Sequence, residues 1–76
     1  MKNTDKASVT KTVIAANLEG LTQRLTEMAQ LAKEASAAME QGEQNLAIGT
    51  VLGFESQIPE IEALFKTALL MHRGSV

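Results

Sequence analysis

The fold is decided by the stretch from Ile14 to Met39, which reads IAANLEGLTQRLTEMAQLAKEASAAM. Its apolar residues recur at alternating spacings of four and three, which is the repeat of a helix that buries one stripe. Most of the residues between them are polar, and nearly all are good helix formers. The repeat predicts one amphipathic helix over about residues 8–41. Its stripe consists of Ile14, Leu18, Leu21, Leu25, Met28, Ala32, Ala35 and Met39.

A glycine is expected to end this helix. Gly42 follows the last residues of the stripe, and glycine is favoured at that place because it adopts a positive φ without strain. A second run with the same spacing starts at Ala47, so we expect a turn at residues 42–45 and a second helix over about 45–73. The second stripe consists of Ala47, Val51, Phe54, Ile58, Ile61, Phe65, Ala68 and His72, with Leu69 beside it.

Pro59 conflicts with an uninterrupted second helix. An interior proline removes a backbone hydrogen bond and clashes with the preceding turn, at a cost of roughly 3 kcal/mol. Either one helix is kinked at Pro59, or one helix ends near Gln57 and another starts with Pro59 in its first turn. The kinked helix is preferred because the apolar repeat continues through Pro59 without slipping.

A short connection makes two helices antiparallel neighbours. The sequence therefore predicts an all-α protein, a long antiparallel helical hairpin that forms one domain over residues 8–76, after a flexible tail at residues 1–7. Pairing about the turn brings together residues whose numbers sum to roughly 85, and so places Phe65 beside Gly20.

One hairpin cannot bury both stripes, because each helix covers only one face of the other. The second helix also carries further large apolar residues, among them Leu52, Leu64 and Leu70. Contiguous apolar surface of this extent marks a partner site, and self-association into a helical bundle would cover it. A dimer of hairpins is the simplest bundle, and higher oligomers stay open. The expected core and oligomer residues are Ile14, Leu18, Leu21, Leu25, Met28, Val51, Phe54, Ile58, Ile61, Phe65 and Leu69.

The composition argues against several classes of function. The 76 residues include no cysteine and one histidine, so neither a thiolate nucleophile nor a cysteine or multi-histidine metal site is expected. A net charge of −2 with two phenylalanines as the only aromatics argues against binding polymeric nucleic acid. We expect no enzyme activity, cofactor or metal. Because no apolar run is long enough to span a membrane, we expect a cytoplasmic protein.

A basic cluster is expected where the two helices end farthest from the turn. It would bring together Lys11, His72 and Arg73, with Lys66 one or two turns away. Together with the N-terminus of the first helix they could bind an anion. Cations near a helix C-terminus are also ordinary complements of the helix dipole, worth about 0.3–1 kcal/mol each.

Two functions are consistent with these features. The first is a small homo-oligomeric bundle that binds another protein as an inhibitor or adaptor, at a scale common among phage and mobile-element proteins. The second is an oligomer that binds a small phosphate-bearing ligand, such as a nucleotide signal, at basic ends between protomers.

Overall fold

The computed structural model describes residues 6–74, and every element in that range is a helix. Helix α1 spans Lys6–Glu40, α2 spans Gln44–Val51 and α3 spans Phe54–Gly74. The prediction of an all-α protein is confirmed. Of the predicted tail, residues 1–5 lie outside the described residues, and the other two belong to α1.

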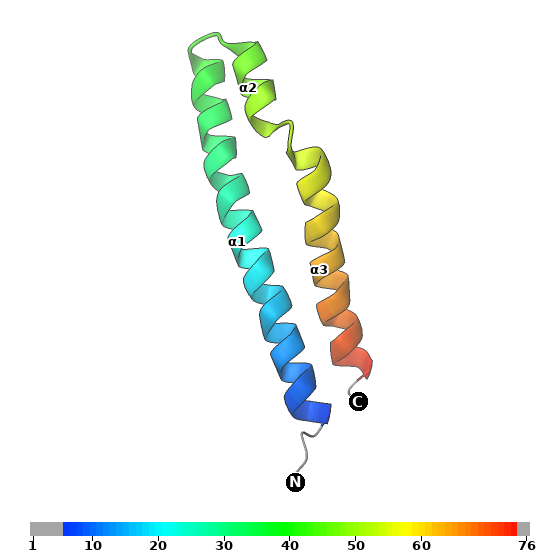
Figure 1. Ribbon diagram of the computed structural model, residues 1–76. Coiled ribbons are helices and arrows are strands. Elements are labelled where there is room, and N and C mark those ends of the chain that lie inside the picture. Colours follow the sequence, from blue (N-terminus) through cyan, green and yellow to red (C-terminus); the bar gives the residue numbers. More distant parts are fainter. Residues whose placement is uncertain (1–5, 75–76) are drawn as a thin grey trace.

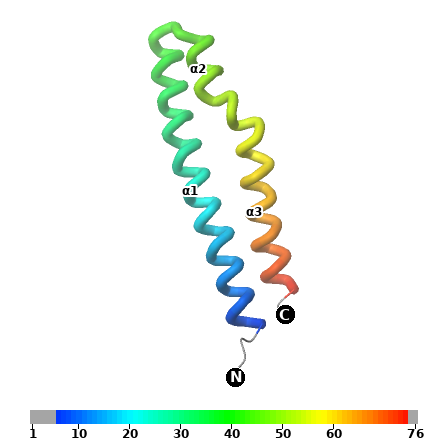
Figure 2. The backbone as a smooth tube through the Cα atoms, viewed as in Figure 1, coloured from blue at the N-terminus to red at the C-terminus, as the bar shows by residue number. Residues whose placement is uncertain are grey.

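The helices form a thin layer. Figures 1 and 2 show α2 and α3 returning alongside α1, so that α1 begins beside the end of α3. We call this the open end, and the end where α1 meets α2 the turn end. The principal-axis extents are 62 × 16 × 14 Å, and the radius of gyration is 17.7 Å. A compact chain of this length would have a radius of gyration of about 11 Å, so this protein lacks the depth for a conventional core.

The turn has a well-defined hydrogen-bond pattern. Gly42 has a φ of +81°, the left-handed conformation that glycine adopts most readily. The backbone N–H of Glu43 donates to the Ala38 carbonyl at 2.9 Å, and that of Gly42 donates to the Met39 carbonyl at 2.9 Å. This pair of bonds is the Schellman arrangement, which satisfies carbonyls at the end of α1. The Glu43 carbonyl then accepts the N–H of Ala47 at 3.0 Å and starts α2.

The second helical run is broken at Leu52–Gly53 and not at Pro59, which corrects both sequence-based alternatives. Two glycines explain the position, since Gly49 and Gly53 are weak helix formers placed one turn apart. The N–H of Leu52 donates to the Gly49 carbonyl across a long distance of 3.4 Å. The N–H of Gln57 donates to the Gly53 carbonyl at 3.1 Å. Pro59 therefore lies inside α3, within its first two turns.

Three of the described residues are buried, and all three are alanines. Ala38 and Ala47 lie near the turn, and Ala68 lies toward the open end. Small side chains between two helices allow the backbones to approach closely. The large apolar side chains are at most half-buried: some face the other helix, and the rest lie exposed on the flanks of the layer.

Candidate interaction face

Helix α1 turns only half of its predicted stripe toward α2 and α3. The members that are half-buried are Ile14, Leu21, Met28 and Ala35. The exposed members are Leu18, Leu25, Ala32 and Met39, spaced seven residues apart. The three large ones among them are 48–51% exposed. The residue just before each exposed member faces the other helices instead. Arg24, for example, is half-buried, whereas Leu25 is exposed.

The second helical run is divided in the same way. Its covered members are Ala47, Val51, Phe54, Ile61 and Ala68. Ile58 and Phe65 are 56% and 52% exposed, and the preceding residues, Gln57 and Leu64, occupy the inner positions instead.

Gly20 shows the consequence directly. A Cβ atom built on Gly20 would lie 3.3 Å from Cδ1 of Leu64, so the glycine makes room for that leucine. The expectation that Phe65 lies beside Gly20 is thus corrected by one residue. The reason is that α3 is rotated so that Leu64 points toward α1 and Phe65 points to the flank.

The exposed rows of the two helices share one flank of the layer. Arg24 and Glu60 form an ion pair across the helices, with Nε and Oε1 3.0 Å apart, and Gly20 meets α3 on the same flank. Leu18 precedes Gly20 by two residues, and Ile58 precedes Glu60 by two. Two residues along an α-helix correspond to a rotation of about 200°, so both point to the opposite flank. We call this opposite flank the apolar face: Leu18, Leu25, Ala32, Met39, Ile58 and Phe65.

The surroundings of the apolar face differ from those of the other flank. On α1, the row next to the face is small and uncharged: Ala15, Thr22, Ala29 and Ser36. The row on the other side of α1 is polar: Gln23, Glu27, Gln30 and Glu34. Small residues beside large ones form the ridges and grooves that a second helix layer can interlock with.

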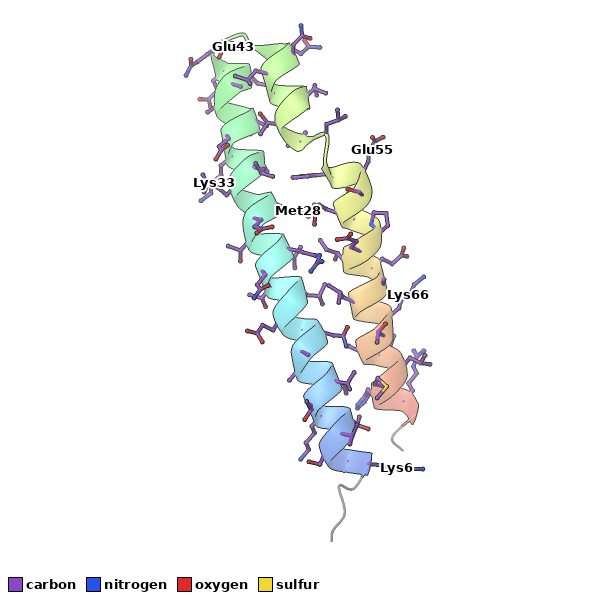
Figure 3. All side chains as sticks on the ribbon, viewed as in Figure 1. Lys6, Met28, Lys33, Glu43, Glu55 and Lys66 are labelled. Atoms are coloured by element: carbon purple, nitrogen blue, oxygen red, sulfur yellow. The ribbon has the colours of Figure 1, made fainter. Side chains whose placement is uncertain are left out.

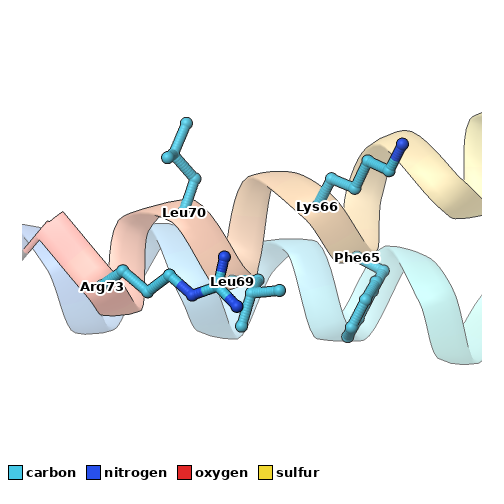
Figure 4. Close-up of a pocket in the computed structure, with 5 residues that line it drawn as sticks. All are labelled: Phe65, Lys66, Leu69, Leu70 and Arg73. Atoms are coloured by element: carbon cyan, nitrogen blue, oxygen red, sulfur yellow. The ribbon is translucent and has the colours of Figure 1, made fainter.

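The sequence-predicted basic residues are brought together only in part. An open hollow of about 360 Å³ on α3 is lined by Lys66 and Arg73 together with Phe65, Leu69 and Leu70 (Figure 4). In this view Lys66 and Leu70 project from one side of the helix and Phe65 from the other. The Nζ of Lys66 also pairs with Glu62 Oε2 at 3.2 Å.

The other two predicted basic residues, Lys11 and His72, do not line this hollow. The lining is therefore mainly apolar, with one cation already paired. This arrangement does not form a compact anion site within a single copy of the chain.

A polar cluster that sequence reasoning missed lies on the Arg24 flank. Gln23, Arg24, Glu27 and Gln57 line an open hollow of about 250 Å³. The Oε1 atom of Gln57 is buried and has no hydrogen-bond partner among the described residues. An unsatisfied buried acceptor costs about 1–3 kcal/mol, so Gln57 weakens the packing of α3 against α1. Its spacing of three from Phe54 and four from Ile61 was the available signal for an inward-pointing side chain.

The charges are divided between the two ends of the layer, as Lys6 at the open end and Glu43 at the turn end illustrate (Figure 3). Residues 6–18 and 66–74 carry Lys6, Lys11, Lys66 and Arg73 and no acidic side chain. Residues 33–55 carry Lys33 against Glu34, Glu40, Glu43 and Glu55. The open end is thus positive and the turn end negative.

Three further observations bear on function. Within residues 6–74, no three histidine, aspartate or glutamate side chains are grouped closely enough to hold a metal ion. Over the same range, none of the helices combines the length and apolar character needed to cross a membrane. Comparison with protein-family models, with curated proteins and with solved structures finds no match. The function is therefore inferred from the geometry of the chain.

Proposed function

We propose that the protein is a small interaction protein in which antiparallel helical hairpins assemble into a homo-oligomeric bundle that binds another protein as an inhibitor or adaptor. One observation carries the proposal. Three alanines are the buried residues of the described chain, while ten large apolar side chains remain 46–69% exposed.

Covering these exposed side chains would stabilise the protein. Burying a large apolar side chain completely is worth about 1.5–3 kcal/mol, so covering the exposed half is worth about 1 kcal/mol. Ten such side chains represent about 10 kcal/mol per chain, which is comparable to the whole stability of a small domain. Association costs about 4–15 kcal/mol, and an interface that covers most of these residues on two chains offsets that cost. Self-association therefore supplies the stability that the alanine core does not.

Surface remains for a protein partner after one flank has been covered. Leu46, Ile48 and Leu52 at the turn end are 56–58% exposed. Ile48 follows the buried Ala47 as Phe65 follows Leu64, so it points to the same flank as the apolar face. Leu46 instead precedes Ala47, so it points to the opposite flank and stays exposed when the apolar face is covered. This small apolar surface favours a partner that is itself a protein.

Sedimentation equilibrium over a range of protein concentrations tests the assembly. A mass of at least twice 8.1 kDa supports the proposal, and a monomer at every concentration contradicts it. For the partner, Leu46→Glu is the informative variant. A protein captured by the wild type should be lost with this variant while the oligomer persists. Retention of the partner by the variant contradicts a role for this surface.

The charge distribution supports a second candidate function. The open end carries Lys6, Lys11 and Arg73, together with Lys66, which pairs with Glu62. A small phosphate-bearing ligand, such as a nucleotide signal, would bind there if two protomers bring their basic ends together. Native mass spectrometry of protein purified from cells should then detect a co-purifying small molecule. Lys11→Glu with Arg73→Glu should abolish its binding, and unchanged affinity would contradict this candidate.

A further inference from the structure

We infer that the apolar face binds a second copy of this chain with the ends reversed, so that the open end of each copy lies against the turn end of the other. This inference rests on the proposed self-association and specifies its geometry. Two copies that share one face are related by a two-fold axis. The axis runs either along the helices, which brings like ends together, or across them, which brings unlike ends together.

The charge distribution distinguishes these two axes. An axis along the helices would juxtapose the two positive open ends and the two negative turn ends. An axis across the helices instead places Lys11 and Arg73 of each copy near Glu40 and Glu43 of the second copy. Like charges held together across an interface are unfavourable, whereas complementary charges select the orientation. The reversed arrangement is therefore favoured.

The sizes of the side chains favour the same arrangement. An axis across the helices lays α1 on its counterpart in the second copy, running in the opposite direction. Counted from Lys11 to Met39, the outer row of α1 has five members spaced seven residues apart, and Leu25 is its centre. Reversal then places Leu25 against the second copy's Leu25, and the large Leu18 against the small Ala32. Large side chains facing small ones allow two layers to pack at native density.

The large residues of the apolar face supply about half of the area that a standard dimer interface buries. A large apolar side chain presents about 150–200 Å², so the five half-exposed large residues of the face contribute roughly 400–500 Å² per copy. The small residues beside them extend the patch along α1. A standard protein interface buries roughly 800 Å² per partner, so the small residues and the charged ends would contribute the remainder.

The arrangement has a consequence for the basic residues. Lys11 lies at the end of the exposed row of α1, seven residues before Leu18. In the reversed dimer it approaches the second copy's turn end, where Met39, Glu40 and Glu43 lie. The basic end then serves to orient the dimer and is not left open for a phosphate.

Disulfide cross-linking tests the geometry, because the chain contains no cysteine of its own. Leu25→Cys is expected to form a disulfide with itself across the dimer. Glu27→Cys, on the same helix but on the opposite flank, is the matched control and should cross-link slowly. With like ends together, α1 instead lies on α3 of the second copy, and Leu25→Cys would pair with Ile58→Cys. The two variants should therefore be mixed and their disulfides identified by mass.

Each result separates the inference from the proposed function. Self-linked Leu25→Cys, formed faster than the control and in preference to the mixed disulfide, supports the reversed dimer. A predominant mixed disulfide overturns the orientation but leaves the dimer. A dimer without either cross-link overturns the use of this face. A chain that sediments as a monomer overturns the proposed self-association itself.

Charge reversal provides an independent measurement. Lys11→Glu with Arg73→Glu, or Glu40→Lys with Glu43→Lys, places like charges together in the reversed dimer. Each double variant should weaken dimerisation about tenfold at low salt, and the quadruple variant should return to near the wild-type affinity. With like ends together, neither double variant increases the number of like-charge contacts. Unchanged dimerisation of both double variants overturns the reversed orientation.

Discussion

Replacing Phe65 with aspartate is the sharpest test of the apolar face. Phe65 is 52% exposed in the single chain, so its replacement removes little packing between α1 and α3. Phenylalanine and aspartate have similar helix propensities, so α3 itself should tolerate the change. Leu70→Asp is the matched control, because Leu70 is 69% exposed and projects from the other side of α3 (Figure 4).

The expected loss can be worked out from the exposure. Covering the exposed half of Phe65 contributes about 1–1.5 kcal/mol per chain, or about 2–3 kcal/mol per dimer. A carboxylate without a partner in an apolar interface adds a penalty of several kcal/mol per ion. A total above about 4 kcal/mol per dimer raises the dissociation constant about a thousandfold. Leu70→Asp, outside the face, should change the dissociation constant by less than about tenfold.

Sedimentation equilibrium measures the dissociation constants, and circular dichroism records the helix content and the melting temperature. The wild-type melting temperature should rise with protein concentration, because association stabilises the folded state by mass action. Phe65→Asp should lose this dependence and melt at a lower temperature. A Phe65→Asp protein that dimerises as tightly as the wild type refutes the reasoning, as does a Leu70→Asp protein that is equally impaired.

Three further substitutions test individual contacts of the layer by chemical denaturation. Gly42→Ala should destabilise the protein by about 1–2 kcal/mol, since a side chain at a φ of +81° is strained; an unchanged stability would contradict the turn geometry. Gly20→Val should cost about 1–3 kcal/mol, because even a Cβ atom there lies 3.3 Å from Leu64 Cδ1; a neutral effect would show that α1 and α3 do not approach at this level. The Arg24–Glu60 pair is exposed at 36% and 54%, so a double-mutant cycle should give a coupling of about 0.2–1 kcal/mol, and zero coupling would remove it from the fold.

The sequence was sufficient for the helices because their signals are local. The repeat in α1 extends over many turns, and Gly42 ends it through a conformation that favours glycine. The break in the second run could not be located, because Pro59 and the pair Gly49 and Gly53 are competing local signals. Proline is the stronger breaker inside a helix, yet α3 continues through Pro59 and the break lies at Gly53.

The division of each stripe was also beyond the sequence. Apolar residues spaced by four and three leave two adjacent residues, such as Arg24 and Leu25, competing for the same inner position. Hydrophobicity alone favours Leu25, whereas in the fold the exposed ion pair with Glu60 accompanies an inner Arg24 and an outer Leu25. Which of the two residues faces inward depends on the rotation of the whole helix about its axis. That rotation cannot be read from a single residue. The predicted basic cluster forms only in part, because Lys66 pairs with Glu62 one turn away.

The alanine core reverses the usual direction of mutational vulnerability. In most small proteins the damaging core changes are truncations, which leave cavities behind. Ala38, Ala47 and Ala68 have almost nothing to truncate, whereas any larger side chain would push the helices apart. Selection at these positions therefore acts as an upper limit on size. Drift toward bulkier residues, rather than loss of hydrophobic mass, is the change that this layer tolerates least.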